Sequence, residues 1–361
     1  MEILSVMKNL FLALFATLFS VSAYAVPYLW QTNSSGNDIH IYNLDGFSLV
    51  RRLEVGPNPH GIAVPKDGSV VYISLEKFKS SHGEILWINP ERLIIERRMD
   101  VCKAPHNITV TPDNKWLYVP CYDGYFLVID TTSGQVVKKI ITGGRPHNVE
   151  VSSDGRYMYL ASLRKVNGVT VVDVQANHEV VGFIPFGGQV RPLWVSEDGQ
   201  RLFQHVDGVN GFMVADTERR VVVNTVEHQT SLGRFRQVKQ LVNRVYRKLG
   251  FERPFHLSEC HGLAVRPDQE EIWSTCGSTL SIHGLIGESY PELGHIKLDG
   301  TGYWVTFSPD SRYGAIALYD RGQVAIVGTD EKAIVKVLDA GRRPKRNVII
   351  DRAIAYEKTA Q

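Results

Sequence analysis

Runs of alternating apolar and polar residues return along this chain in units of about 40 to 45 residues, apart from one longer unit. Each unit begins with a polar residue followed by an apolar run, as in His60 to Val64, and an Asp interrupts the pattern seven positions after the start. Asp followed by Gly between two apolar runs, as at Asp67, predicts a tight β-hairpin. A third and a fourth apolar run follow, for example residues 127–130 and 135–141. Each unit therefore predicts four short strands.

A repeat of this length with four strands per unit is typical of a β-propeller, in which each blade covers the apolar face of the next. The last unit has only a first strand, while residues 28–32, 38–43 and 48–55 read as a second, a third and a fourth strand. We therefore predict an all-β, seven-bladed β-propeller with four-stranded blades. Its ring closes when the C-terminal strand pairs with the three N-terminal ones, which hides the edges of an open array.

One unit resembles a known family. Residues 56–68 read Gly-Pro-Asn-Pro-His-Gly-Ile-Ala-Val-Pro-Lys-Asp-Gly, and Tyr72 follows. This pattern is similar to the YVTN-type β-propeller repeat, which occurs in surface-layer proteins, quinoprotein dehydrogenase heavy chains and lactonases. The resemblance covers nearly the whole chain after its N-terminus and implies the propeller fold, but it does not specify a function. Two departures are Ala315, which stands where other units have an aromatic residue, and the long fourth unit.

Length and charge narrow the class of protein. A closed ring of blades is one domain, so we expect residues 26–361 to form a single domain, and we expect a monomer. The chain has 40 Lys and Arg against 38 Asp and Glu, a net charge of +2. This balance argues against a nucleic-acid partner, whose binding requires clustered basic residues. After the N-terminus no stretch is long and apolar enough to cross a bilayer.

The first 25 residues read as a secretory signal peptide. Lys8 supplies the positive start, residues 10–21 are almost entirely apolar, and Ala23-Tyr24-Ala25 is a small-x-small cleavage site. We expect cleavage after Ala25. The short, compact signal predicts export to a bacterial periplasm.

Export changes how the four cysteines are interpreted. In two units one Cys precedes the first strand and another ends the second strand, so a hairpin brings them together. We predict the disulfides Cys102–Cys121 and Cys260–Cys276 in an oxidising compartment. Free buried thiols are the alternative, because Cys is often simply buried. No CxxC spacing exists to favour a four-cysteine zinc site.

The residues that start the units are the candidate binding site. First strands line the channel of a propeller, so these side chains are expected to meet at one channel mouth. They are His60, His106, His147, Arg191, His261, Tyr303 and Arg346. The alternative is a structural role for each residue within its own blade, but the change from His to Arg or Tyr between units favours a ring of ligand contacts.

The composition of this ring bears on its ligand. Three histidines from consecutive blades would suit zinc, copper or iron. The ring lacks a carboxylate, however, and holds two guanidinium groups, which are the preferred forks for carboxylate or phosphate. We therefore expect a small anionic ligand. A metal carried inside an anionic cofactor stays open, and neither a metal nor a cofactor is assigned.

The long fourth unit contains an insertion, residues 228–259. Apolar residues recur there at three- and four-residue spacing, which predicts an amphipathic helix. Its basic face would form a lid over the channel mouth, made of Arg234, Arg236, Lys239, Arg244, Arg247 and Lys248. A helix packed on the rim, or one that docks to an acidic partner or a lipid surface, are alternatives.

Three functions are compatible with this sequence. The first is an exported propeller that binds a small anion or cofactor at the channel mouth. The second is an enzyme that uses the same His and Arg ring, either a lactonase-like hydrolase or a redox partner. The third is a protein–protein interaction scaffold. The sequence contains no GxSxG, HExxH, P-loop or CxxCH motif, so whether the protein is an enzyme is left open.

Overall fold

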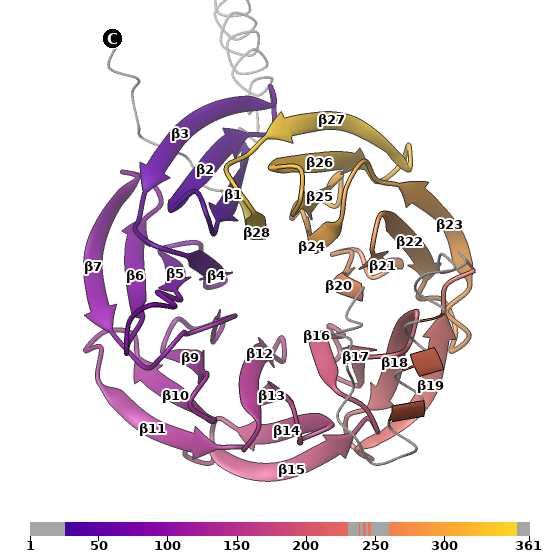
Figure 1. The fold of residues 1–361 in the computed structure, drawn as a ribbon, viewed down its shortest axis with the longest axis horizontal. Helices are drawn as coiled ribbons and strands as arrows, with labels where there is room; N and C mark the ends of the chain where they lie inside the picture. Colours follow the sequence, from indigo (N-terminus) through magenta and orange to yellow (C-terminus); the bar gives the residue numbers. More distant parts are fainter. Residues whose placement is uncertain (1–25, 230–237, 239–240, 243–244, 247–259, 352–361) are drawn as a thin grey trace, which may run out of the picture.

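The computed structural model describes residues 26–229, 238, 241–242, 245–246 and 260–351. These residues form 28 strands in seven four-stranded antiparallel sheets, which stand as blades around a common axis (Figure 1). The predicted seven-bladed β-propeller is confirmed. In each blade the first strand lies nearest the axis and the fourth lies on the outside.

The blades follow one another along the chain. The first combines β28 (Pro344–Asp351) with β1 (Pro27–Asn33), β2 (Asp38–Asn43) and β3 (Ser48–Glu54). The second contains β4 (Pro59–Ala63), β5 (Val71–Leu75), β6 (Glu84–Asn89) and β7 (Ile94–Asp100). The third contains β8 (Thr109–Val110), β9 (Trp116–Cys121), β10 (Tyr125–Asp130) and β11 (Val136–Ile141). The fourth contains β12 (Arg145–Val151), β13 (Tyr157–Leu163), β14 (Gly168–Asp173) and β15 (Glu179–Pro185).

The remaining three blades have the same order. The fifth contains β16 (Val190–Val195), β17 (Arg201–Val206), β18 (Gly211–Asp216) and β19 (Val221–Glu227). The sixth contains β20 (Cys260–Val265), β21 (Glu271–Cys276), β22 (Thr279–Gly284) and β23 (Glu292–Lys297). The seventh contains β24 (Gly302–Phe307), β25 (Tyr313–Leu318), β26 (Gln323–Gly328) and β27 (Ala333–Asp339).

The two ends of the chain close the ring as predicted. Strand β28 pairs antiparallel with β1, with Trp30 opposite Val348. The Thr32 hydroxyl of β1 donates a hydrogen bond of 3.0 Å to the Arg346 carbonyl of β28, which supports this pairing of the two strands. The same hydroxyl lies 3.0 Å from the His60 carbonyl of the second blade. Closure therefore ties the first and second blades together close to the axis.

The repeated Asp has a clear structural role. In six units its carboxylate accepts a hydrogen bond of 2.9 to 3.0 Å from the backbone N–H two residues later. This is the Asx arrangement that favours tight turns. The residue after the Asp has a left-handed backbone in every case, which explains why Gly often stands there. The positions concerned are Gly68, Asn114, Gly155, Gly199, Gln269 and Ser311.

The recurring aromatic residue forms the core between blades. Tyr72, Tyr118 and Phe203 are almost fully buried, and each packs in a cluster with residues of the following blade. Ala315 takes this place in the seventh blade and packs in the cluster that contains Tyr42 of the first blade. The small Ala315 side chain is therefore accommodated because Tyr42 of the neighbouring first blade supplies an aromatic ring to this cluster.

Both predicted disulfides are present, Cys102–Cys121 and Cys260–Cys276. Cys260 and Cys276 stand directly opposite each other in β20 and β21. The alternative of free buried thiols is wrong, because all four cysteines are paired.

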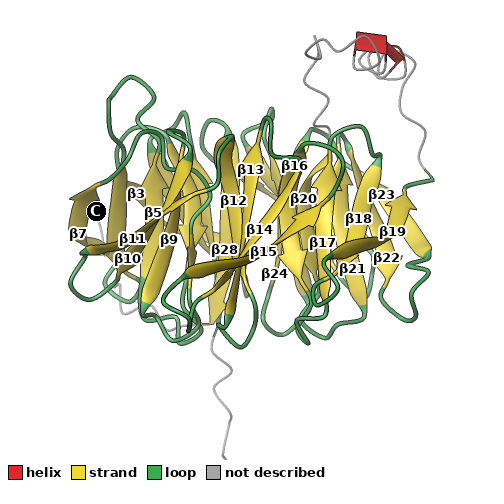
Figure 2. Cartoon of the chain, turned by 90° about the horizontal axis from the view of Figure 1, so that it is seen from below, coloured by secondary structure: helices red, strands yellow, loops and turns green. Residues whose placement is uncertain are grey.

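The described part of the insertion agrees with the predicted helix. Residues 238, 241–242 and 245–246 are helical, and Val238, Leu241 and Val245 are exposed. They stand beyond the face at which the first strands begin (Figure 2). The predicted lid residues lie outside the described residues, as does the predicted signal peptide, residues 1–25. They are Arg234, Arg236, Lys239, Arg244, Arg247 and Lys248.

Among the described residues, no helix has the length and apolar character needed to traverse a bilayer.

Candidate functional site

Five of the residues that start the repeats lie side by side around the axis. The His60 and His106 rings have centroids 3.8 Å apart, and those of His106 and His147 are 4.0 Å apart. His261 stacks on Tyr303 with a centroid distance of 3.9 Å. Two wider ring contacts complete the series. The centroid distance is 6.3 Å between His147 and His261 and 6.2 Å between Tyr303 and His60. We call these five residues the histidine–tyrosine circle.

Small residues allow this close approach. Gly61 follows His60, and a Cβ atom there would lie 2.4 Å from the His106 carbonyl oxygen. Gly262 follows His261, and its Cβ would lie 3.0 Å from the Trp304 carbonyl carbon in the first strand of the next blade. Neighbouring first strands therefore come close only because these positions lack a side chain, which brings the imidazoles of adjacent blades into contact.

Two hydrogen bonds of the circle cross between blades. The His261 Nδ1 lies 3.0 Å from the Tyr303 carbonyl in the next blade. The His106 Nδ1 lies 2.6 Å from Glu76 Oε1 in the preceding blade. These two contacts differ from the alternative in which each histidine bonds within its own blade. The His147 Nδ1 bonds to the neighbouring Asn148 side chain.

Glu76 is the residue that sequence reasoning missed. It follows the end of β5, and its second carboxylate oxygen lies 3.2 Å from the His60 Nδ1, although not in hydrogen-bond geometry. The seven starting residues include no carboxylate, but Glu76 supplies one beside the histidines. Glu76 stands sixteen residues after His60, and the equivalent residues Tyr122 and Asp207 also contact repeat-start residues. This spacing is the signal that would have found Glu76.

Burial keeps the circle neutral. Burial, followed by neighbouring positive groups, holds the pKa of His60, His106, His147 and His261 well below the usual 6.5. Burial also raises the pKa of Glu76 to about 8, although Lys345, Arg145 and Arg346 oppose the shift. At neutral pH the imidazoles are therefore uncharged and the Glu76 carboxyl is mostly protonated.

The two predicted arginines lie in different surroundings. The Arg191 Nε is 2.9 Å from Asp207 Oδ1, and Gln189 also donates to Asp207 at 2.8 Å. Its charge is thus partnered within the protein. Arg346 instead packs 3.5 Å above the Trp304 ring and is 1% exposed. None of its three guanidinium nitrogens has a hydrogen-bond partner among the described residues.

Arg346 borders a cavity inside the channel, on the far side of the histidine–tyrosine circle from the channel mouth. This cavity has a volume of about 240 Å³, and its lining includes Asn107, Glu150, Trp194, Trp304, Thr306 and Arg346. Burial lowers the pKa of Arg346 to about 10, so the guanidinium remains charged at neutral pH. All seven starting residues were expected at one channel mouth. The Arg346 side chain instead lines the cavity inside the channel.

Glu150 is the only acidic side chain among the residues that line this cavity. Its side chain is partly exposed toward the cavity, and burial of the rest raises the pKa of Glu150 to about 8, against a backbone hydrogen bond from Val151 and the attraction of Arg346. At pH 7 most of the carboxyl is protonated. The charge of Arg346 therefore lacks a full counter-charge in the free protein.

A basic pocket adjoins the circle at the channel mouth. It has a volume of about 630 Å³ and is lined by Lys103, Arg145, Arg164 and Lys165, with Asp123 as its one acidic residue. Tyr122, which also lines this pocket, packs against His106 with a centroid distance of 5.8 Å and tilted ring planes. Arg145 lies 3.5 Å above the Tyr122 ring. An anion that approaches the channel mouth therefore meets a positive surface.

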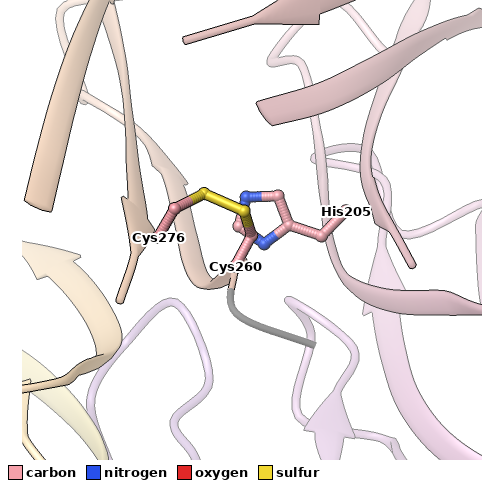
Figure 3. A group of neighbouring side chains, drawn as sticks. All are labelled: His205, Cys260 and Cys276. Atoms are coloured by element: carbon pink, nitrogen blue, oxygen red, sulfur yellow. A yellow bond between two sulfur atoms is a disulfide. The ribbon is translucent and has the colours of Figure 1, made fainter. Parts of the chain in front are cut away.

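A second group of histidines lies between the fifth and sixth blades. Ser274 Oγ is 2.9 Å from both His205 Nε2 and His228 Nε2, and His228 Nδ1 is 2.9 Å from His283 Nε2. The His283 Nδ1 is 2.9 Å from the Tyr290 carbonyl. Figure 3 shows His205 against the Cys260–Cys276 disulfide. These histidines do not occupy a repeated position, so the sequence gives no sign of the group.

Comparisons with known proteins place the fold but not a family. No protein-family model matches the chain, and no curated protein does so either. Among solved structures, the periplasmic gluconolactonase PpgL of Pseudomonas aeruginosa is 16% identical, with 90% of this chain and 99% of that chain covered and a TM-score of 0.69.

Two further structures are similar. A putative 6-phosphogluconolactonase of Bacteroides fragilis is 14% identical over 92% of this chain and 99% of its own, with a TM-score of 0.69. The hydrazine synthase of Kuenenia stuttgartiensis is 19% identical over 79% of this chain and 87% of that chain, with a TM-score of 0.65. At these identities the likeness concerns the fold alone. The chain is a seven-bladed β-propeller with lactonase-like structural neighbours.

Proposed function

We propose that this protein binds a small anion inside the propeller channel, with Arg346 as its main contact. One observation carries the proposal: a charged guanidinium is almost completely buried and has no hydrogen-bond partner among the described residues. A buried charge without a partner is strongly unfavourable. A bound carboxylate, sulfate or phosphate would supply both the missing charge and the missing acceptors.

The surroundings of Arg346 favour such a ligand. The cavity beside it is about 240 Å³, which is smaller than the sites that hold drug-sized molecules. Trp194 and Trp304 supply apolar walls, and Glu150 and Asn107 supply polar groups. We infer a ligand with one anionic group and a short organic part. We also propose that the protein binds this ligand outside the cytoplasm, since two disulfides are typical of an oxidising compartment.

A panel of anions tests this function. Sulfate, phosphate, acetate and gluconate are titrated into the protein, with heat of binding and the rise in unfolding temperature as readouts. We expect at least one anion to bind, and we expect Arg346→Gln to weaken it about 10- to 100-fold, because a charge-assisted hydrogen bond is lost. Arg219→Gln, in an exposed turn, serves as the control and should bind as the wild type does.

Two results would contradict the proposal. One is that no anion stabilises the protein at millimolar concentration. The other is that Arg346→Gln binds the same anion as well as the wild type, which would move the site to the basic pocket at the mouth.

Anion affinity should also depend on pH through Glu150. Its pKa is raised to about 8, so the carboxyl is mostly neutral at pH 7 and ionised at pH 9. The ionised carboxylate then competes with the ligand for Arg346. Sulfate has no titration of its own in this range, and we expect its affinity to fall several-fold between pH 7 and pH 9. Glu150→Gln should remove part of that fall, because Glu76, whose pKa is also raised to about 8, acts on Arg346 as well. An unchanged decline in Glu150→Gln would show that Glu150 does not contribute.

Lactone hydrolysis, the enzymatic alternative, stays a hypothesis. Its support is the likeness to two lactonase structures, which concerns the fold, and one fold hosts many functions. Adding gluconolactone to the same panel and recording acid release tests it directly. Hydrolysis above the uncatalysed rate would favour the enzyme, whereas binding of the acid without turnover would favour the binding protein.

A further inference from the structure

Two imidazoles and one carboxylate meet where the second and third blades approach the axis. His60 comes from β4, Glu76 follows β5 of the same blade, and His106 precedes β8 of the next blade. Each residue offers one ligand atom, and these three atoms lie within 4.8 Å of one another. All three side chains are buried, so the group is held by the blades rather than by a mobile surface.

The hydrogen bonding of this group is incomplete. Glu76 Oε1 lies 2.6 Å from the His106 Nδ1, and Oε2 lies 3.2 Å from the His60 Nδ1. Neither nitrogen of His60 has a hydrogen-bond partner among the described residues, and nor does the His106 Nε2. Buried polar atoms normally find partners, so three unpartnered nitrogens in one place point to a missing ligand.

Two other groups in the described part of the chain have a similar make-up, but their atoms are already engaged. In His205, Cys260 and Cys276 the two sulfur atoms are joined in a disulfide. In the group of His228, His283 and Glu292 the two histidines bond to each other, and their other nitrogens bond to Ser274 and to the Tyr290 carbonyl. Of the three groups found in the described residues, the group of His60, Glu76 and His106 alone keeps several nitrogens without a partner.

We propose that His60, Glu76 and His106 bind one divalent first-row transition ion. Two imidazole nitrogens and a carboxylate oxygen are a common ligand set for zinc and for iron(II), and three protein ligands leave a position open for water or an anion. The ion would displace to solvent the proton that Glu76 and His106 share. This site is separate from the anion contact at Arg346, which lines the cavity beyond the circle.

The positive groups around the site shape what it binds. Lys345, Arg145 and Arg346 are close enough to Glu76 to act on its charge. They lower the affinity for a bare cation and favour an anion at the open position of the ion. A metal at this site would therefore strengthen, rather than replace, the preference of the channel for anionic ligands.

Metal titration tests the inference without any anion. The full-length protein is treated with EDTA, dialysed and titrated with zinc chloride against a chromophoric chelator, and cobalt(II) is added separately to record the visible spectrum of a protein-bound ion. We expect one ion per chain and a cobalt spectrum typical of nitrogen and oxygen ligands. Glu76→Gln and His60→Gln should each weaken zinc binding about 100-fold and alter or abolish that spectrum.

Control variants separate this site from the others. His228→Gln, in the second histidine group, and His82→Gln, on the surface, should bind zinc and cobalt as the wild type does. Arg346→Gln should also keep the ion, so a failure of the anion proposal would not be mistaken for a failure of this one. If Glu76→Gln does not fold, His60→Asn decides the question. Less than one ion per chain, or loss of binding in His228→Gln but not in the Glu76 and His60 variants, would overturn the proposal.

Discussion

Replacing Arg346 with methionine is expected to raise the free energy of unfolding by about 1–3 kcal/mol and to abolish anion binding in the same variant. Arg346 is buried without a hydrogen-bond partner among the described residues, so the free protein carries the cost of a desolvated charge. Methionine has a similar length, fills the space beside Trp304 and removes that charge. The lost cation–π contact offsets part of the gain.

The matched control is the other buried arginine of the predicted ring. Arg191 is paired with Asp207, so Arg191→Met should leave a buried carboxylate without its main partner and lower stability by about 3–5 kcal/mol. Urea unfolding of both variants measures the difference, and anion titration measures binding. If Arg346→Met is as destabilised as Arg191→Met, Arg346 is a structural residue and the proposed anion contact fails.

Removing the disulfides should have the second large effect. Cys102–Cys121 spans 19 residues and Cys260–Cys276 spans 16. Each loop restricts the unfolded chain, and loops of this length contribute about 3 kcal/mol each. The double variants Cys102→Ser/Cys121→Ser and Cys260→Ser/Cys276→Ser should therefore each lower the free energy of unfolding by about 2–4 kcal/mol.

The second pair should also affect its neighbourhood. The Cys260–Cys276 disulfide lies against His205, whose Nε2 is 2.9 Å from Ser274 (Figure 3). Hydrogen exchange of β20 and β21 should rise more in this variant than exchange of the distant β6 and β7. A reducing agent should destabilise the wild type by about the sum of the two variants and leave a protein that lacks both disulfides unchanged. Equal stability of wild type and variants would show that the links do not restrain the unfolded chain.

Much of the fold could be predicted because its information is local. The repeated Asp stabilises its own turn through the N–H two residues later, and the left-handed residue after it is written in the sequence as Gly68, Gly155 or Gly199. The strands and their order follow from these turns. Both disulfides followed as well, since a hairpin of known phase places Cys260 opposite Cys276.

The candidate site was predictable only in part. The period places His60, His106 and His147 at equivalent points of the ring, and their rings do meet there. The recurring position sixteen residues after each start indicates where partners such as Glu76 come from, but not which neighbour each of them contacts. Glu76 contacts His106 across a blade boundary, and Asp207 pairs with Arg191. These acidic partners make the site less positive than its seven starting residues alone.

By itself, the sequence determined the blade, the number of blades, the closure of the ring and the residues that begin each first strand, because turns and alternation act over a few residues. Only the tertiary structure decided which of those residues keep a free charge or a free nitrogen. Among the described residues Arg346 has no hydrogen-bond partner whereas Arg191 has one, and burial keeps the histidines neutral. Such differences arise from burial and from contacts between blades, which depend on distances that the order of residues does not contain.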